Sequence, residues 1–200
     1  MVFMIFVNII LRVVFLALSV VAAVLCLHID VNIFRNGISE YSLTEIVQES
    51  ILAVIIFIHL MRAINSSKMR LCNVLIAGFF TAMLIRELDA VFDLISHGSW
   101  VWFALAVSFA TLLYVLRHPR QILAELAEYI EKPSYGLMIS GLLAILVFSR
   151  VFGMSILWQS ILQEGYVREV KNMVEEGSEL FGYMLCLCAS IGILNIRSRK

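Results

Sequence analysis

The sequence predicts an all-α, polytopic membrane protein: a bundle of six transmembrane helices with one short amphipathic cytoplasmic helix between the fourth and the fifth. Hydrophobic residues make up 62% of the 200 residues, whereas soluble domains have about 45–50%, and the mean hydropathy is +0.95. The apolar runs also approach or exceed the length of about 20 residues that spans a bilayer. Because the connections between them are short, we expect residues 1–200 to form a single integral membrane domain.

Six apolar runs define the expected spans. The first carries Arg12, has no basic leader and lacks a small-residue cleavage site, so it is predicted to be a retained helix rather than a signal peptide. The second follows Ser42-Leu43-Thr44-Glu45, a capping box that starts a helix. The expected spans cover about residues 3–27, 44–64, 71–95, 99–117, 135–160 and 170–195.

The connection between the fourth and fifth spans reads "RHPRQILAELAEYIEKPS" and predicts a helix of its own. Pro119 favours a helix start and Pro133 a helix end. Four apolar side chains fall on one side of this helix, which is typical of a helix that lies on the membrane surface. The alternative is a loop helix packed under the bundle. The four side chains belong to Ile122, Leu123, Leu126 and Ile130.

Lysine and arginine residues predict the orientation, because basic residues gather in cytoplasmic loops. Nine lie in the 2–3 loop, the 4–5 loop and the C-terminal tail, against three on the opposite side. Both termini are therefore expected in the cytoplasm, in a plasma membrane such as the bacterial inner membrane. The nine are Arg62, Lys68, Arg70, Arg117, Arg120, Lys132, Arg197, Arg199 and Lys200; the three are Arg35, Arg168 and Lys171.

Charged residues within four of the spans form the candidate site. The third span ends in "LIRELDAVFD", in which Arg86, Asp89 and Asp93 have the spacing i, i+3, i+7 and are expected to share one helix face. The other spans place further charges at a similar depth, in the outer half of the bilayer. The candidate ligand- or ion-binding residues are Glu49, Arg86, Glu87, Asp89, Asp93, Arg150, Glu175, Glu176 and Glu179.

This set predicts a carboxylate-rich polar chamber that faces the outside. A charge at the bilayer centre costs at least about 2.5–3.5 kcal/mol, so such groups turn toward one another or toward water. Two arginines cannot neutralise seven acids, which favours protonated carboxylates or a bound cation. A transporter or channel for a proton or a small cation is the first hypothesis. The alternative is that the charges pair only to hold the bundle together.

Two polar residues on the second span, Gln48 and His59, extend the hypothesis to a proton path that leads inward. His59 lies about three turns deeper than the acidic start of that helix. The alternative for His59 is a hydrogen-bonded packing residue.

Two other classes of protein remain open. The chain could be a scaffold or a subunit of an envelope complex, whose charged faces pair with a partner. Independently of the class, a homo-oligomer or membrane-partner contact is expected at the small residues that repeat every four positions on the sixth span, a spacing that lets helices approach closely. These residues are Ser178, Gly182, Cys186 and Ser190.

The third class is an intramembrane enzyme with a carboxylate-bound metal, which is less favoured. Hard cations take oxygen ligands, but the four histidines do not converge, and the sequence contains no P-loop or serine-hydrolase motif. We predict no catalytic residue and no cofactor other than a cation, and the identity of any metal is undefined. Zero net charge and the absence of a basic patch argue against a nucleic-acid partner, which leaves the lipid bilayer as the expected environment.

Overall fold

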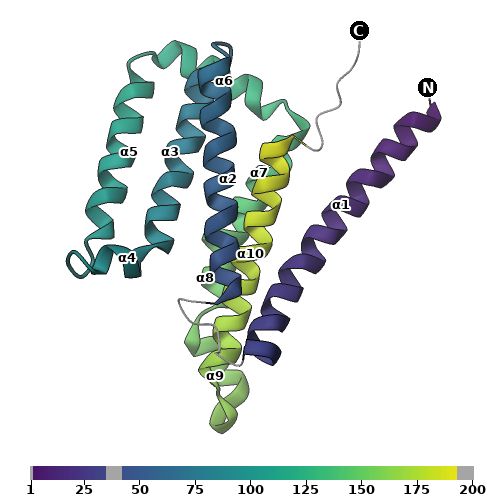
Figure 1. The fold of residues 1–200 in the computed structure, drawn as a ribbon, viewed down its shortest axis with the longest axis vertical. Coiled ribbons are helices and arrows are strands. Elements are labelled where there is room, and N and C mark those ends of the chain that lie inside the picture. Colours follow the sequence, from purple (N-terminus) through teal and green to yellow (C-terminus); the bar gives the residue numbers. More distant parts are fainter. Residues whose placement is uncertain (1, 35–41, 193–200) are drawn as a thin grey trace. The chain divides into compact units, whose positions relative to one another are not determined.

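A computed structural model describes residues 2–34 and 42–192, and within these ranges the chain is helical without any strand (Figure 1). The all-α prediction is confirmed. The chain divides into two compact units, Met1–Gln48 with Gly136–Lys200 and Glu49–Tyr135. The two boundaries between the units fall inside helices, the first in α2 (Leu43–Asn65) and the second in α7 (Pro133–Leu143).

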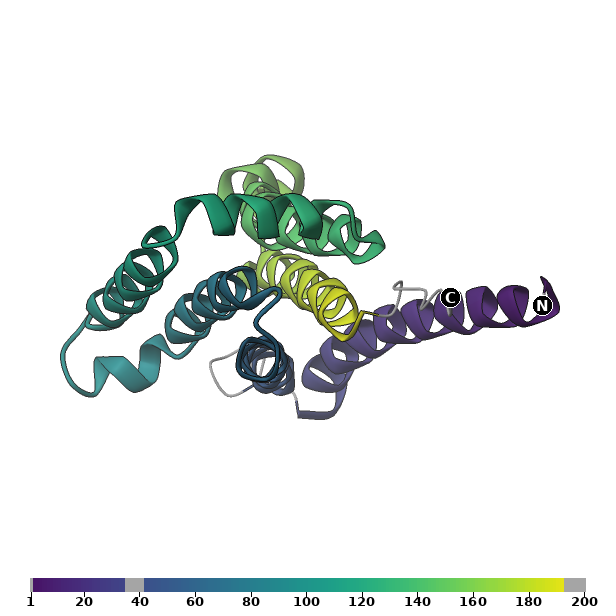
Figure 2. The ribbon, with the colours of Figure 1, turned by 90° about the horizontal axis from the view of Figure 1, so that it is seen from above.

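The first unit is built around α10. This helix contacts α1, η2 and α8, and Figures 1 and 2 show α1 diverging from it toward the N-terminal end of the chain. Besides the first turns of α2, the unit contains α1 (Val2–Ile29), the π-helical η1 (Asp30–Phe34), α7 (Pro133–Leu143) from Gly136 onward, the π-helical η2 (Ala144–Phe148), α8 (Ser149–Phe152), α9 (Ser155–Leu162), the 3-10 helix η3 (Gln163–Gly165) and α10 (Arg168–Ile191).

The second unit holds the rest of α2 together with α3, α4, α5 and α6. Helices α3 and α5 approach closely at Gly78, where an added Cβ would lie 2.2 Å from Thr111 Oγ1. A small buried cluster of Leu71, Cys72, Val115 and Ile122 joins the ends of α3 and α5 to α6. The bounds are α3 (Arg70–Glu87), α4 (Asp89–Asp93), α5 (Trp100–Leu116) and α6 (Pro119–Ile130).

Three described helices are long and apolar enough to cross a membrane: Ile9–Phe34, Leu43–Asn65 and Pro133–Phe152. A fourth candidate is the bent pair Trp100–Leu116 and Pro119–Ile130. The chain is therefore compatible with a membrane protein of three or four spans, and the predicted count of six is not confirmed.

Helix α10 is not among the candidate spans because the first half of the helix is charged. Its apolar part, residues 180–191, is about 18 Å long, short of the roughly 30 Å hydrocarbon core. If α10 crosses the bilayer, its charged side chains must be compensated inside the protein. These side chains belong to Arg168, Glu169, Lys171, Glu175, Glu176 and Glu179.

Two of the predicted continuous spans are interrupted. The run 71–95 breaks at Leu88, which has φ −85° and ψ 24° and separates α3 from α4. The run 135–160 breaks after α8, where Met154 is extended with φ −66° and ψ 123°. Each break lies a few residues after an arginine, Arg86 in the first case and Arg150 in the second. The expectation of continuous helices over these two runs was wrong.

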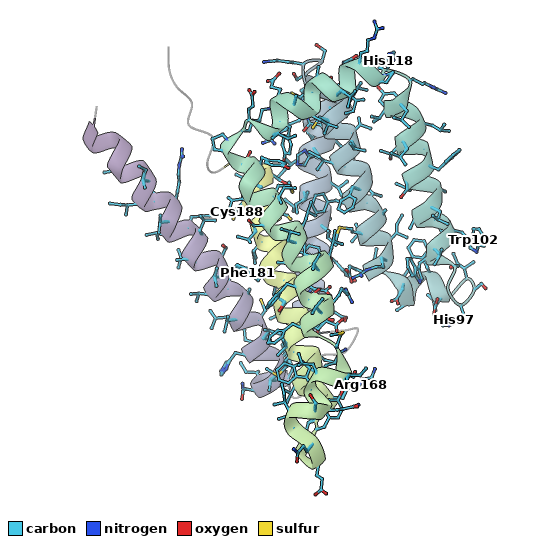
Figure 3. The ribbon with its side chains drawn as sticks, turned by 180° about the vertical axis from the view of Figure 1, so that it is seen from behind. His97, Trp102, His118, Arg168, Phe181 and Cys188 are labelled. Carbon is cyan, nitrogen blue, oxygen red and sulfur yellow. The ribbon has the colours of Figure 1, made fainter. Side chains whose placement is uncertain are left out.

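The helix predicted between the fourth and fifth spans is confirmed as α6, with Pro119 as its first residue. Its axis is bent by 101° from that of α5, and Figure 3 labels His118 at the bend. Ile122 packs into the buried cluster and Leu126 packs against it, whereas Leu123 and Ile130 are exposed. The four predicted apolar residues therefore divide between a packed face and an exposed one.

Candidate functional site

The first unit brings together four charged side chains, which we call the α8–α10 ion cluster: Arg150, Lys171, Glu175 and Glu179. Arg150 Nη1 donates to Glu175 Oε1 at 2.8 Å, and Arg150 Nη2 donates to Glu179 Oε1. Lys171 Nζ lies 2.5 Å from the other oxygen of Glu175. Glu175 thus bridges two cations, and the two positive and two negative charges of the cluster balance.

Burial differs strongly within the α8–α10 ion cluster. The side chain of Glu179 is 2% exposed and that of Arg150 is 42% exposed. Gly153, at the end of α8, leaves room for the bridging carboxylate, since a Cβ added there would lie 2.9 Å from Glu175 Cδ. The helix break and the ion cluster therefore depend on the same short segment of backbone.

Gln48 connects the start of α2 to α10. Its Nε2 donates to the backbone oxygen of Glu176 at 3.1 Å and to Glu176 Oε2 at 3.2 Å. His59 has a different partner, because its Nδ1 lies 2.8 Å from Asn73 Oδ1 at the start of α3. Gln48 and His59 are both buried, but their hydrogen bonds lead to different helices. The proton path through both residues stays a prediction, and the hydrogen-bonded packing reading of His59 fits this geometry.

The second unit holds a smaller charged group on α2 and α3. Arg86 Nη2 donates to Glu87 Oε1 at 2.6 Å, and the carboxylates of Glu49 and Glu87 interact electrostatically. Both members of the Arg86–Glu87 pair are partly exposed. This group contains two acids and one arginine.

Asp89 and Asp93 do not share a helix face with Arg86 in the way the spacing predicted. The break at Leu88 starts a new helix, α4, and both aspartates are exposed. Asp93 accepts a hydrogen bond from Gly98 N at 2.7 Å, and its other oxygen lies 2.8 Å from His97 Nδ1. The carboxylate of Asp93 thus stabilises the turn that leads into α5.

The nine predicted site residues therefore separate into groups. Arg150, Glu175 and Glu179 come together, with Glu176 on the same helix, while Glu49, Arg86 and Glu87 belong to the other unit. Convergence of all of them around one chamber stays a prediction. Among the described residues, no three histidine, cysteine, aspartate or glutamate side chains are placed to hold a metal ion together. The carboxylate-metal enzyme stays a hypothesis.

Lys171 and Asp30, which do not belong to the predicted site, have defined partners, and Ser42 caps α2 as the capping box predicted. Lys171 joins the α8–α10 ion cluster through an i, i+4 contact, a spacing that the sequence alone could have revealed. Asp30, which is buried, accepts hydrogen bonds from the backbone of Leu43 at 2.7 Å and of Thr44 at 2.8 Å. Asp30 thereby caps α2 together with Ser42, whose Oγ accepts from Glu45 N at 3.2 Å.

The small residues of α10 pack within the chain. Added Cβ atoms would lie 2.6 Å from Cys186 Sγ at Gly141 and 2.8 Å from the Gly141 carbonyl oxygen at Gly182. Gly182, Cys186 and Ser190 are buried. At Gly182 and Cys186 the four-residue repeat packs against α7 of the same chain. A contact of the repeat with a second copy or a membrane partner stays a prediction.

An apolar groove of about 650 Å³ lies between α10 and the segment formed by α7, η2 and α8. It contains no charged side chain, so it is separate in character from the α8–α10 ion cluster. Its lining residues are Ser140, Leu143, Ala144, Val147, Phe148, Val151, Ser178 and Phe181.

Comparison of the chain with protein-family models, curated proteins and solved structures gave no match.

Proposed function

We propose that this protein is an integral membrane protein of the transporter or channel type, whose α8–α10 ion cluster binds a proton or a small cation. The observation that carries the proposal is the almost complete burial of Glu179, which is paired with Arg150 close to a break in the helix that bears the arginine. Ionisable groups inside a membrane are costly and commonly mark the paths of ions and protons. Helix breaks at membrane depth are tolerated where the backbone is buried in protein or lines a cavity.

A proton is the better supported of the two ligands. Among the described residues, no set of three acids is arranged for a metal, and the oxygens of Glu175 already face Arg150 and Lys171. Protonation of Glu179 would neutralise a buried carboxylate and weaken its attraction to Arg150. Arg150 is the more exposed member of the pair and already donates to Glu175 through Nη1, so its Nη2 can then turn toward water, which couples proton binding to a local movement.

Proton flux tests this proposal directly. The full-length protein is reconstituted into liposomes that contain a pH-sensitive dye, and a potassium gradient with valinomycin sets the voltage. We expect flux from the wild-type protein and none from Glu179→Gln, because the amide cannot exchange a proton. Glu169→Gln is the matched control: it makes the same substitution on the same helix at an exposed position, and it should retain the flux. Equal flux from both variants, or none from the wild type at any pH, rejects the proposal.

We further propose six spans with both termini in the cytoplasm of a plasma membrane. The nine-to-three distribution of lysine and arginine supports this orientation. The polar contacts of Lys171, Glu175 and Glu179 support a crossing by α10, because they compensate most of its inner charges.

The expected result of cysteine labelling follows from this topology. Cysteines introduced at Lys68 and Arg120 should react with a membrane-impermeant maleimide only after the cells are permeabilised. A cysteine at Gly165, which lies in η3 before α10, should react in intact cells. Labelling of position 68 or 120 from outside would overturn the orientation.

A scaffold or complex subunit is the second candidate, and α1 favours it. In the most apolar part of the candidate span Ile9–Phe34, only 6% of the residues are buried. Most of the surface of this helix is therefore available to lipid or to another protein. The two candidate functions predict different compositions of the purified sample. A scaffold should co-purify with a partner at fixed stoichiometry and give no flux when alone, whereas a conduit should conduct without a partner.

A further inference from the structure

Helix α6 lies across the ends of α3 and α5, and one of its faces is packed against them (Figure 1). Ile122 on this inner face belongs to the buried cluster with Leu71 and Val115. Beside it, the buried carboxylate of Glu125 accepts a hydrogen bond from Cys72 N at 2.8 Å, which caps the start of α3. These contacts fix the rotation of α6 about its own axis, and so determine which residues point outward.

The outward face of α6 is apolar, although it lies at the end of the helices. Leu123 is 66% exposed and Ile130 is 54% exposed, and Ala127 lies between them at the spacing i, i+4, i+7, which places all three on one face. We call these three residues the α6 outer stripe. Nothing in the described residues of the second unit covers the stripe, since its three members are exposed.

The charges around the α6 outer stripe are biased toward positive. Arg117 and Arg120 are exposed at the start of the helix. Of the three acids in this segment, Glu125 is turned inward and Glu128 pairs with Lys68 at 3.0 Å. Only Glu131 remains on the outward side against the two arginines, so the surface favours an anionic partner.

The angle of α6 identifies that partner. The orientation of α6 rests on the proposed crossing of the bilayer by α5: α6 is bent by 101° from α5, so α6 then lies close to the plane of the membrane. A stripe of exposed apolar residues beside arginines, on a helix in this plane, is the pattern of a helix that rests in the headgroup layer. A cationic segment at this depth is attracted by anionic lipids.

We propose that α6 is a lipid-binding surface: the α6 outer stripe inserts at the headgroup layer of the bilayer, and Arg117 and Arg120 bind the phosphates of anionic lipids there. This role is separate from the proton site in the other unit and does not depend on it. The connection between the fourth and fifth predicted spans thus anchors the protein to the membrane, and the strength of this anchoring depends on the lipid composition.

The first part of the test measures the depth of the stripe. The full-length protein carrying Ala127→Cys or Gln121→Cys is labelled with a bimane fluorophore, with the wild-type protein as the control for labelling of its own four cysteines. Gln121 is exposed but lies about 120° away from Ala127 around the helix. In nanodiscs, a nitroxide attached to the lipid headgroup region should quench the label at 127 more than the label at 121, and iodide in the water should do the reverse.

The second part measures the lipid preference. Nanodiscs of phosphatidylcholine with phosphatidylglycerol are dissolved in mild detergent, and the lipids retained by the protein are counted by native mass spectrometry. Each of Arg117→Gln and Arg120→Gln should lower the enrichment of phosphatidylglycerol about fivefold. Arg168→Gln, an exposed arginine elsewhere in the chain, should leave it unchanged.

Three outcomes would overturn the proposal. Equal iodide quenching at 127 and 121 would mean that the stripe faces water. Protection of the label at 127 from both quenchers would mean that a second copy of the chain or another protein covers it. Unchanged phosphatidylglycerol enrichment in the arginine variants would remove the anionic lipid as the ligand. None of these readouts involves proton flux, so failure here is distinguishable from failure of the proposed function.

Discussion

Leucine at position 182 is expected to prevent the first unit from folding. A Cβ alone at Gly182 would lie 2.5 Å from Ile145 Cγ1 and 2.8 Å from the Gly141 carbonyl oxygen. The side chain of Ile145 can turn, but the carbonyl can move only if the backbone of α7 moves with it. Overpacking of this kind costs typically about 1–3 kcal/mol for small changes, so Gly182→Ala should be clearly less stable and Gly182→Leu should not accumulate as folded protein.

Thermal unfolding of the purified protein in detergent, followed by near-ultraviolet circular dichroism, measures this effect. Gly165→Ala is the control, because a Cβ at that position would meet no atom within 4 Å. A melting temperature for Gly182→Ala equal to that of wild type would show that α7 and α10 do not cross closely at this point. The substitution therefore tests the helix crossing on which the geometry of the α8–α10 ion cluster depends.

The location of the helices could be predicted from the sequence because long apolar runs and prolines are local signals. The predicted runs near 3–27, 44–64 and 99–117 correspond to α1, α2 and α5, and Pro119 begins α6 as expected. The breaks were harder to predict. Leu88 is a residue that normally favours a helix, so nothing in the local sequence indicates that α3 ends beside it. Gly153, beside the second break, is only a weak local signal, because glycine lowers helix stability by no more than about 1 kcal/mol.

The sequence predicted which residues belong to the candidate site better than it predicted how they are arranged. Buried charges can be predicted from the sequence, because charged residues inside apolar runs must find partners. The pairing of Lys171 with Glu175 can also be predicted, since both residues lie on one helix at a spacing of four. The pairing of Arg150 with Glu179 depends on how α8 packs on α10, and no local pattern encodes this. The grouping of Arg86 with Asp89 and Asp93 failed because it assumed an unbroken helix.

The two members of the Arg150–Glu179 pair are expected to respond differently to neutralisation. In Arg150→Gln, the carboxylate of Glu179 stays at a position where its side chain is 2% exposed and loses its guanidinium partner. Removing one charged partner of a buried charged group costs about 1–3 kcal/mol or more. In Glu179→Gln, the buried charge itself is removed, the amide oxygen can still accept from the arginine, and Arg150 keeps Glu175 at 2.8 Å. We expect Arg150→Gln to lower the free energy of unfolding more than Glu179→Gln.

A double-mutant cycle in detergent at neutral pH separates a proton site from a structural ion pair. If the α8–α10 ion cluster serves function, Glu179→Gln should keep a melting temperature close to that of wild type while proton flux is lost, and the double variant should recover much of the stability that Arg150→Gln loses. The recovery is expected because neutralising Glu179 removes the buried charge that the guanidinium of Arg150 no longer compensates. A purely structural pair should give the opposite pattern: both single variants would be destabilised to a similar extent, and loss of flux would follow loss of folded protein. Since Arg150 is shared by Glu175 and Glu179 while Glu179 is almost fully buried, the geometry favours the asymmetric result.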